Sequence, residues 1–495
     1  MNRQDRFLRA GVLAVVGLGL IPPIVLGLWE TGRAAFGILP ALGRDAWTFD
    51  PWRRLATLPG FGTSLRLTLV TGFGSTLLSL LLATGFCAAV HARVTPLAGA
   101  RMLTPFLAIP HAAMAVGLAF VLAPSGWIAR ALAPLAGWSR PPELSLVNDG
   151  WGLALMIGLM VKELPFLLLV ILSALSQIPV ARQMAAGRAL GYGRGIVWIK
   201  VIMPQVWPLI RLPVWVVLAY ALSVVDMAII LGPSNPPTLA VAVTRWFTYP
   251  DPAMILPASA GAILQALVVV SGVALLWLGE RAARRLGRWW LRLGGRGVSA
   301  EPGLWAASAG VLVLMALGAL GMMALLVWSL AWRWSFPQLL PETWSLRGWA
   351  EGGWFRAMRM TLLLAGATVA LSLVIAVAWL EGEDRARRTR APWAEALIYL
   401  PLLIPQIGFL YGLNVIFLRA GLSGGTVAVI WAQALFVFPY VMIALSDPWR
   451  ALDPRLVNAA AALGAGPWRR LWAVKLPILL RPILTAAAIG VAVSV

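Results

Sequence analysis

Ionisable and amide side chains are rare inside the long apolar stretches of this sequence, and they are the residues that could do chemistry there. Asp226 lies about two-thirds along an apolar run at 207–231, and His111 and Gln406 each follow a proline inside two other runs. A charged side chain within a membrane-spanning segment usually faces the interior of a helix bundle or water. These residues therefore suggest a path that a solute crosses, rather than a catalytic centre.

Two interpretations stay open for these residues. Asp226 either faces a translocation path or pairs with an arginine or a backbone amide. His111 and Gln406 either line the path as a matched pair or form hydrogen bonds with the backbone carbonyls that a proline kink leaves free. Lys162 and Glu163 are adjacent in another run and point to different sides of a helix, so we expect each to contact other spans rather than its neighbour.

The remaining composition argues against an enzyme. The sequence has 2 histidines and 1 cysteine, Cys87. No catalytic triad, phosphate-binding loop or zinc motif is visible, and a disulfide within the chain is excluded. We expect no catalytic residue, no metal site and no cofactor.

Apolar composition indicates an all-α polytopic membrane protein. Hydrophobic residues make up 60% of the chain and charged residues 12%, whereas soluble domains carry about 25% charged residues. Runs long enough to span a bilayer are predicted at about 11–29, 65–90, 103–123, 151–175, 207–231, 255–278, 304–330, 359–380, 396–418, 425–445 and 480–495.

The net charge of +21 gathers in alternate loops between these runs. This pattern predicts a cytoplasmic N-terminus, and it favours a solvated, lipid-facing role for the basic segment 280–296 over nucleic-acid binding. That segment is expected to link two domains. The first apolar run is expected to be a retained helix rather than a signal peptide, because no small-residue cleavage site follows it.

One segment of the sequence occurs twice. Residues 185–204 read AAGRALGYGRGIVWIKVIMP, and residues 458–477 read NAAAALGAGPWRRLWAVKLP. Each has small residues, a Leu-Gly step and a closing proline, with the same spacing from glycine to proline. A glycine permits a left-handed turn between two short helices, and proline is tolerated in the first turn of the next helix. Two loops of one design suggest two identical docking sites for a soluble partner.

The internal duplication extends well beyond these segments. The matched residues are Arg66 with Arg359, Thr68 with Thr361, Ser79 with Ser372, Ala83 with Ala376, Pro110 with Pro405 and Gly117 with Gly412. We predict two parallel repeats of about six spans each, at 1–298 with a loop near 177–206 and at 299–495 with a loop near 446–479. The second repeat is expected to be incomplete at its C-terminal end, because it stops within an apolar run soon after its loop.

The repeated segments resemble the EAA loop of ABC-importer permeases, which has a Glu-Ala-Ala triplet, a later glycine and an ending in Ile-x-Leu-Pro. The resemblance implies a pair of short coupling helices that docks in a groove of a cytoplasmic ATPase. It assigns docking to Ala185, Ala186, Gly191, Val201 and Pro204, and to Asn458, Ala459, Ala460, Gly464, Val474, Leu476 and Pro477. Ala185 and Asn458 replace the glutamate of the family, and Gly187 replaces its second alanine. Any ionic contact made by that glutamate is therefore absent, and docking must rest on shape and apolar contact.

The whole chain is similar to the fused-permease branch of type I ABC importers, which includes the ferric-iron and thiamine permeases. Residues Ser223 to Asp226, followed by Leu231-Gly232, look like a segment of that branch. The resemblance implies a transport subunit without chemistry of its own, which works by alternating access. Its expected partners are two copies of a separate ABC ATPase, a solute-binding protein outside the membrane, membrane lipid and a small solute, with thiamine or ferric iron preferred; a nucleic acid is not expected.

Two other classes of membrane transport protein are alternatives to an ABC permease. An ion-coupled secondary transporter with parallel repeats would call for several buried acids or broken helices near the midplane, whereas Asp226 and Glu163 are nearly alone in the spans. A channel is the third class. Neither rival accounts for the paired loops.

Overall fold

The computed structural model describes residues 3–90, 96–143, 146–294, 301–386, 392–422 and 424–494. Within these ranges, nine helices are long and apolar enough to cross a membrane, or ten if the bent pair Pro467–Ile478 and Leu480–Ser494 counts as one span. A two-stranded antiparallel hairpin, of β1 (Ala331–Arg333) and β2 (Thr343–Trp344), is the only sheet in these ranges. The prediction of an all-α polytopic membrane protein is confirmed.

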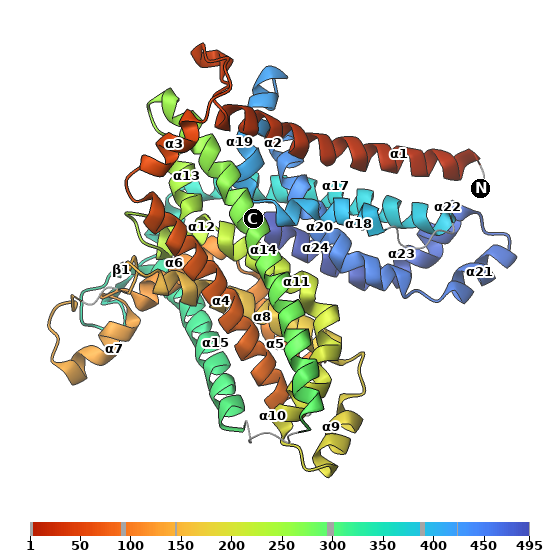
Figure 1. Ribbon diagram of the computed structural model, residues 1–495, viewed down its shortest axis with the longest axis horizontal. Coiled ribbons are helices and arrows are strands. Elements are labelled where there is room, and N and C mark those ends of the chain that lie inside the picture. The colour runs from red at the N-terminus through yellow and green to blue at the C-terminus, as the bar shows by residue number, and fades with distance from the viewer. Residues whose placement is uncertain are drawn as a thin grey trace. The chain divides into compact units, whose positions relative to one another are not determined.

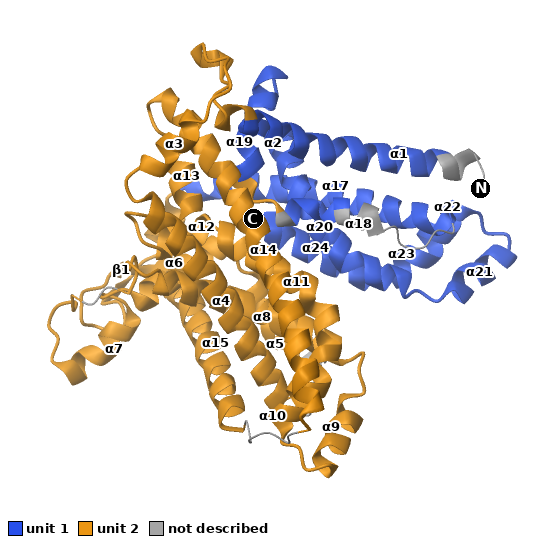
Figure 2. Ribbon diagram, in the orientation of Figure 1, with its two compact units in different colours: residues 1–32, 352–402, 408–495 blue, residues 33–351, 403–407 orange. Residues whose placement is uncertain are grey.

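The chain divides into two compact units (Figure 2). Unit 1 comprises residues 1–32, 352–402 and 408–495, and unit 2 comprises residues 33–351 and 403–407. These limits differ from the predicted repeats, because each unit contains the first helix of the opposite half of the sequence. The repeat boundary at 298/299 lies outside the described residues and stays a prediction.

Unit 2 is built around a central helix, α8, against which α4, α5 and α11 pack, while α15 packs on α4 and α6 (Figure 1). Its helices are α3 (Asp50–Thr57), α4 (Phe61–Val90), α5 (Pro96–Ala108), α6 (His111–Leu122), α7 (Trp127–Ala136), α8 (Leu153–Leu175), α9 (Val180–Ala189), α10 (Arg194–Val197), α11 (Met203–Ser223), α12 (Asp226–Leu231), α13 (Leu239–Phe247), α14 (Ile255–Arg292), α15 (Glu301–Leu330) and α16 (Arg347–Ala350), with 3-10 turns at Pro40–Leu42 and Pro252–Met254 and a π-helical turn at Trp198–Ile202.

Unit 1 is a bundle in which α17, α20 and α24 pack on one another and α1 packs on α17. Its helices are α1 (Arg3–Gly19), α2 (Ile21–Ala35, whose last turn belongs to unit 2), α17 (Gly353–Arg385), α18 (Pro392–Leu403), α19 (Gln406–Arg419), α20 (Thr426–Arg450), α21 (Pro454–Ala462), α22 (Pro467–Arg470), α23 (Leu476–Ile478) and α24 (Leu480–Ser494), with a π-helical turn at Leu471–Lys475.

Small and hydroxylated residues allow other helices to pack against α4 in unit 2. The buried face of α4 carries Ser64, Thr68, Thr71, Ser75 and Ser79. The hydroxyl groups of Thr68 and Thr71 donate to the carbonyls one turn earlier, of Ser64 at 2.9 Å and of Leu67 at 2.8 Å. The hydroxyls of Thr68 and Thr71 are thus satisfied within their own helix, and the short side chains of this face let neighbouring helices approach α4.

Several predicted spans are not continuous helices. The run 103–123 breaks at Pro110 between α5 and α6, and the run 396–418 breaks at Pro405 between α18 and α19. A proline lacks the N–H that continues the helix and its ring clashes with the preceding turn. The run 480–495 is the second arm of a helix pair bent by 74°. The basic segment 280–296 was expected to be a linker, but as far as Arg292 it continues the spanning helix α14.

Glycines allow two pairs of helices to touch backbone to backbone. A methyl group added at Gly117 on α6 would collide with the carbonyl of Gly321 on α15, within unit 2. In unit 1, a methyl group at Gly412 on α19 would collide with the carbonyl of Gly27 on α2. Each contact joins the first spanning helix of one sequence half to the third of the other, and small residues at such crossings permit it.

We expect Gly117→Ala to destabilise the protein, because the added methyl group would overlap backbone atoms of Gly321. Relieving this overlap requires the two helices to shift, which costs free energy of folding. Overpacking of this kind costs about 1–3 kcal/mol, so the melting temperature in detergent should fall. The control is Gly279→Ala on α14, where nothing lies within 4 Å of the added methyl group. Equal melting temperatures for the two variants would show that the glycine contact is not needed.

Candidate functional site

The two repeated segments fold into the same succession of elements. In the first, α9 ends in a turn at Gly191, and α10 and a π-helical turn then lead into α11. In the second, α21 ends in a turn at Gly464, and α22 and a π-helical turn lead into α23. The φ angles of the two glycines are 82° and 83°, so both predicted left-handed turns are present.

Matching backbone hydrogen bonds close the two turns. The N–H of Gly191 donates to the carbonyl of Arg188 at 2.9 Å, and the next N–H, of Tyr192, donates to Gly187 at 3.1 Å. In the second segment Gly464 donates to Ala461 and Ala465 to Ala460, both at 3.0 Å. This pattern of two bonds satisfies the last carbonyls of a helix and reverses the chain through a residue that must be glycine or be strained.

Both turns present apolar surface to solvent. Leu190 and Leu463, each directly before its glycine, are 64% and 88% exposed. The other predicted docking residues are exposed except Ala460 and Val474, which are half-buried, as is Leu476; the exposed ones are Ala185, Ala186, Gly191, Val201, Pro204, Asn458, Ala459, Gly464 and Pro477. An exposed leucine at the tip of a rigid turn is a surface that a partner protein can cover.

The first segment is held to the rest of unit 2 by two cations. Arg194 donates from Nη1 to the carbonyl of Ala89 at 3.1 Å, at the end of α4, and its Nε lies 3.9 Å from a carboxylate oxygen of Glu301. Lys200 lies over the ring of Trp290 on α14, at 4.4 Å. Ile202, at the end of the π-helical turn, is fully buried. The segment is thus tied to α4, α14 and α15.

A polar cluster in unit 2 brings together two of the three predicted path residues. Tyr220 joins them: its ring lies 4.8 Å from that of His111, and its hydroxyl donates to Asp226 Oδ1 at 3.4 Å. Asp226 is exposed and His111 half-buried. Gln406 is exposed at the start of α19, and within the described residues it makes no hydrogen bond with His111 or Asp226. The expected pairing of His111 with Gln406 therefore gains no support from the geometry.

Asp226 does not lie within a continuous helix, as the run 207–231 had suggested. The helix α11 ends at Ser223, Val224 is extended, and Asp226 begins the short helix α12. Gln265 from α14 donates to the carbonyl of Leu222 at 2.8 Å, which satisfies part of the broken end. An acid at a helix N-terminus is electrostatically favourable. The break moves Asp226 to the end of a helix, where its carboxylate is accessible.

Lys162 serves the proline break in the neighbouring pair of helices. Its ammonium donates to the carbonyls of Phe106 at 2.9 Å and Ile109 at 2.6 Å. Phe106 stands four residues before Pro110, so its carbonyl lacks the usual helical donor. The expected contact of Lys162 with another span is confirmed. The sequence had suggested His111, rather than Lys162, as the partner of the carbonyls that the proline leaves free. Tyr220 was missed, because a single tyrosine in an apolar run gives no signal. The free carbonyl of Phe106 could have been found from the sequence, because the residue four positions before a proline loses its helical hydrogen-bond donor.

Comparison with known proteins agrees with this architecture. Residues 368–495 match the family described as binding-protein-dependent transport system inner membrane component. The chain is 29% identical over 389 residues to the inner membrane ABC transporter permease protein YnjC of Escherichia coli, a match that covers 79% of this chain and 68% of that protein.

Two further relatives are named for their transport systems. The molybdenum transport system permease protein ModB of Azotobacter vinelandii is 31% identical over 154 residues, covering 28% of this chain and 67% of that protein. The putative 2-aminoethylphosphonate transport system permease protein PhnV of Salmonella typhimurium is 30% identical over 104 residues, covering 21% of this chain and 39% of that protein. With its many apolar helices, the chain is a multi-pass membrane protein that belongs to the permeases of type I ABC importers.

Proposed function

We propose that the two glycine-turn segments dock two copies of a separate ABC ATPase, and that the chain carries a small solute across the bacterial inner membrane by alternating access. The observation that carries this proposal is the match of the two turns, at φ angles of 82° and 83°, each with an exposed leucine at its tip. Two surfaces of one shape suit two copies of one partner. The permease itself performs no chemistry.

The local structure supports a mechanical role for the segments. Each docking turn passes through a short helix and a π-helical turn directly into a membrane helix, α11 or the α23–α24 pair. Few residues outside helical elements separate the proposed ATPase contact from the spans. Closure of the ATPases would therefore move the membrane helices with little deformation of the segment between them. Because both segments are basic and lie among the basic loops of the sequence, we assign them and the N-terminus to the cytoplasm. The turn at 232–237 then faces outward, toward a solute-binding protein.

For the solute path we propose the cluster of His111, Tyr220 and Asp226. Asp226 is an exposed carboxylate beside a hydroxyl and an imidazole, and Lys162 lies near enough for its charge to interact with it. A charged group among membrane spans calls for water or a partner, which a solute path provides. The preference for thiamine or ferric iron rests on resemblance alone and has no support from the relatives, whose names point to molybdenum and 2-aminoethylphosphonate.

We expect Gly464→Glu, and likewise Gly191→Glu, to leave the protein in the membrane but to weaken ATPase capture at least about tenfold, or about 1.4 kcal/mol. A side chain at this φ angle strains the turn and adds a charge to its tip. Pull-down of the ATPase from detergent measures the effect. The control is Gly466→Ala, at a φ angle of −64° with nothing within 4 Å. Wild-type capture and transport by both glutamate variants would refute docking at the turns.

We expect Asp226→Asn to insert and accumulate normally, to keep basal ATP hydrolysis and to lose uptake, because the amide keeps the size of the side chain and removes its charge from the path. Uptake in vesicles and melting temperature would be compared with Glu351→Gln, an exposed acid outside the spans. Reduced abundance with a lower melting temperature would instead indicate a structural pair. Normal uptake would exclude Asp226 from the path.

A further inference from the structure

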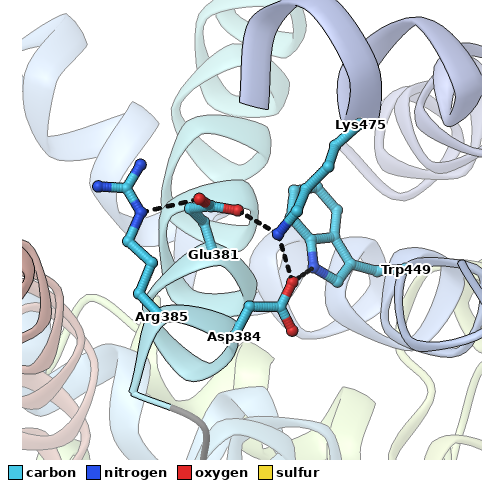
Figure 3. A network of polar contacts seen from close by, with 5 residues as sticks. All are labelled: Glu381, Asp384, Arg385, Trp449 and Lys475. Carbon is cyan, nitrogen blue, oxygen red and sulfur yellow. Dashed lines mark hydrogen bonds and ion pairs between the residues drawn. The ribbon is translucent and has the colours of Figure 1, made fainter. Parts of the chain in front are cut away.

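A network of buried charges joins the second segment to two membrane helices of unit 1 (Figure 3). Lys475 donates to Glu381 Oε2 at 2.7 Å and to Asp384 Oδ2 at 2.6 Å. Glu381 also accepts from Arg385 Nε at 2.8 Å, and Asp384 accepts from the indole N–H of Trp449 at 2.9 Å. Each donated hydrogen bond ends on a carboxylate, so the charges form one connected cluster.

The cluster is largely shielded from water. The side chains of Lys475, Glu381 and Arg385 are 4–6% exposed, while that of Asp384 is 44% exposed. Burying charges is expensive, and a buried pair often contributes no net stability over apolar residues of the same size. The burial of these charges therefore calls for a role other than stability alone.

The positions of the five residues suggest that role. Lys475 is the last residue of the π-helical turn, directly before Leu476-Pro477 at the end of the docking segment. Glu381, Asp384 and Arg385 lie in the last two turns of α17, and Trp449 in the last turn of α20. The ring of Trp468, on α22, lies 4.5 Å from the Arg385 guanidinium. The docking segment is thus attached at two points to the ends of two spanning helices.

The first segment has no counterpart to this pair of charges. The alignment that matches Ala83 with Ala376 matches Ala88 with Glu381, and the alignment that matches the two turn glycines matches Ile202 with Lys475. Ala88 and Ile202 are fully buried members of one apolar cluster. At the corresponding positions, therefore, one half carries an apolar pair and the other an ion pair.

We propose that Lys475 is a positioning residue for energy coupling, which locks the second docking segment to the ends of α17 and α20 so that the segment and the helices move as one body. The two docking sites are then alike in shape and unlike in their connection to the membrane. This proposal rests on the proposed ATPase docking.

The test uses the full chain in complex with its ATPase. Spin labels would be placed at Leu456 on α21 and Leu371 on α17, both exposed, and their distance distribution measured with and without ATP and vanadate. Cys87 is buried, so the introduced cysteines are labelled selectively. In the wild type the distance should stay the same. Lys475→Met should widen the distribution at least twofold on ATP binding, with ATPase capture reduced less than twofold.

Three further variants make the result specific. Lys475→Arg keeps the charge and should keep the narrow distribution. Glu381→Ala with Lys475→Ile reproduces the apolar pair of the first half, so it should still show the wide distribution. Arg450→Met removes an ion pair with Glu383, 2.9 Å long, that joins α20 to α17, and it should leave the distance unchanged.

The outcomes separate the two proposals. If the wild-type chain captures no ATPase, the proposed docking fails. If capture is normal and the distribution of Lys475→Met matches that of the wild type, the docking stands and the coupling role of Lys475 is refuted. If both variants that remove the ion pair fail to accumulate while Lys475→Arg accumulates, the cluster is a requirement of folding, and the coupling role is likewise refuted.

Discussion

Hydrocarbon offers no hydrogen bond to a polypeptide backbone, and this constraint governs every irregular point of the membrane helices. At the break between α5 and α6, the ammonium of Lys162 donates to the carbonyls of Phe106 and Ile109. Where α11 ends at Ser223, the side-chain amide of Gln265 donates a hydrogen bond to the carbonyl of Leu222. At each of these two breaks a polar side chain from another helix supplies the hydrogen bond. The proposed solute cluster of His111, Tyr220 and Asp226 lies beside these two interruptions.

The same need for satisfied backbone groups shapes the two glycine-turn segments that are proposed to dock the ATPase. A helix that ends in a left-handed glycine closes its last carbonyls without help from the membrane helices, so the turn can stand out in water and remain rigid. The backbone joins each turn to the membrane helix that follows it, and side chains connect the segment to the other spans. Arg194 and Lys200 supply this connection in the first segment, and Lys475 in the second. A surface of constant shape can thus be joined to its helices in two different ways.

Much of the architecture could be predicted from the sequence, and the exceptions have physical causes. Leu-Gly steps with equal spacing to a proline predicted both turns, because only glycine adopts that φ angle without strain. Hydropathy averages over a window, so it did not register the breaks at Pro110 and Pro405. The break before Asp226 has no glycine or proline to mark it. The sequence did not predict that each unit contains the first helix of the opposite half. An apolar helix face can pack against many other apolar faces, so its pattern does not specify which helix it contacts. No prediction was made for Lys475, since its acids lie some ninety positions earlier in the chain.

The central claim, that the two turns contact an ATPase, is tested most directly by thiol cross-linking of Leu190→Cys and Leu463→Cys in membranes that contain the complete transporter. The natural cysteine is buried, so each introduced thiol is the accessible one. Leu135→Cys, at a position 87% exposed on α7, is the control, because the charge pattern assigns its loop to the opposite side of the membrane. We predict ATPase adducts at positions 190 and 463 and none at 135. Absence of adducts at both turns, or equal labelling at all three positions, would contradict the account.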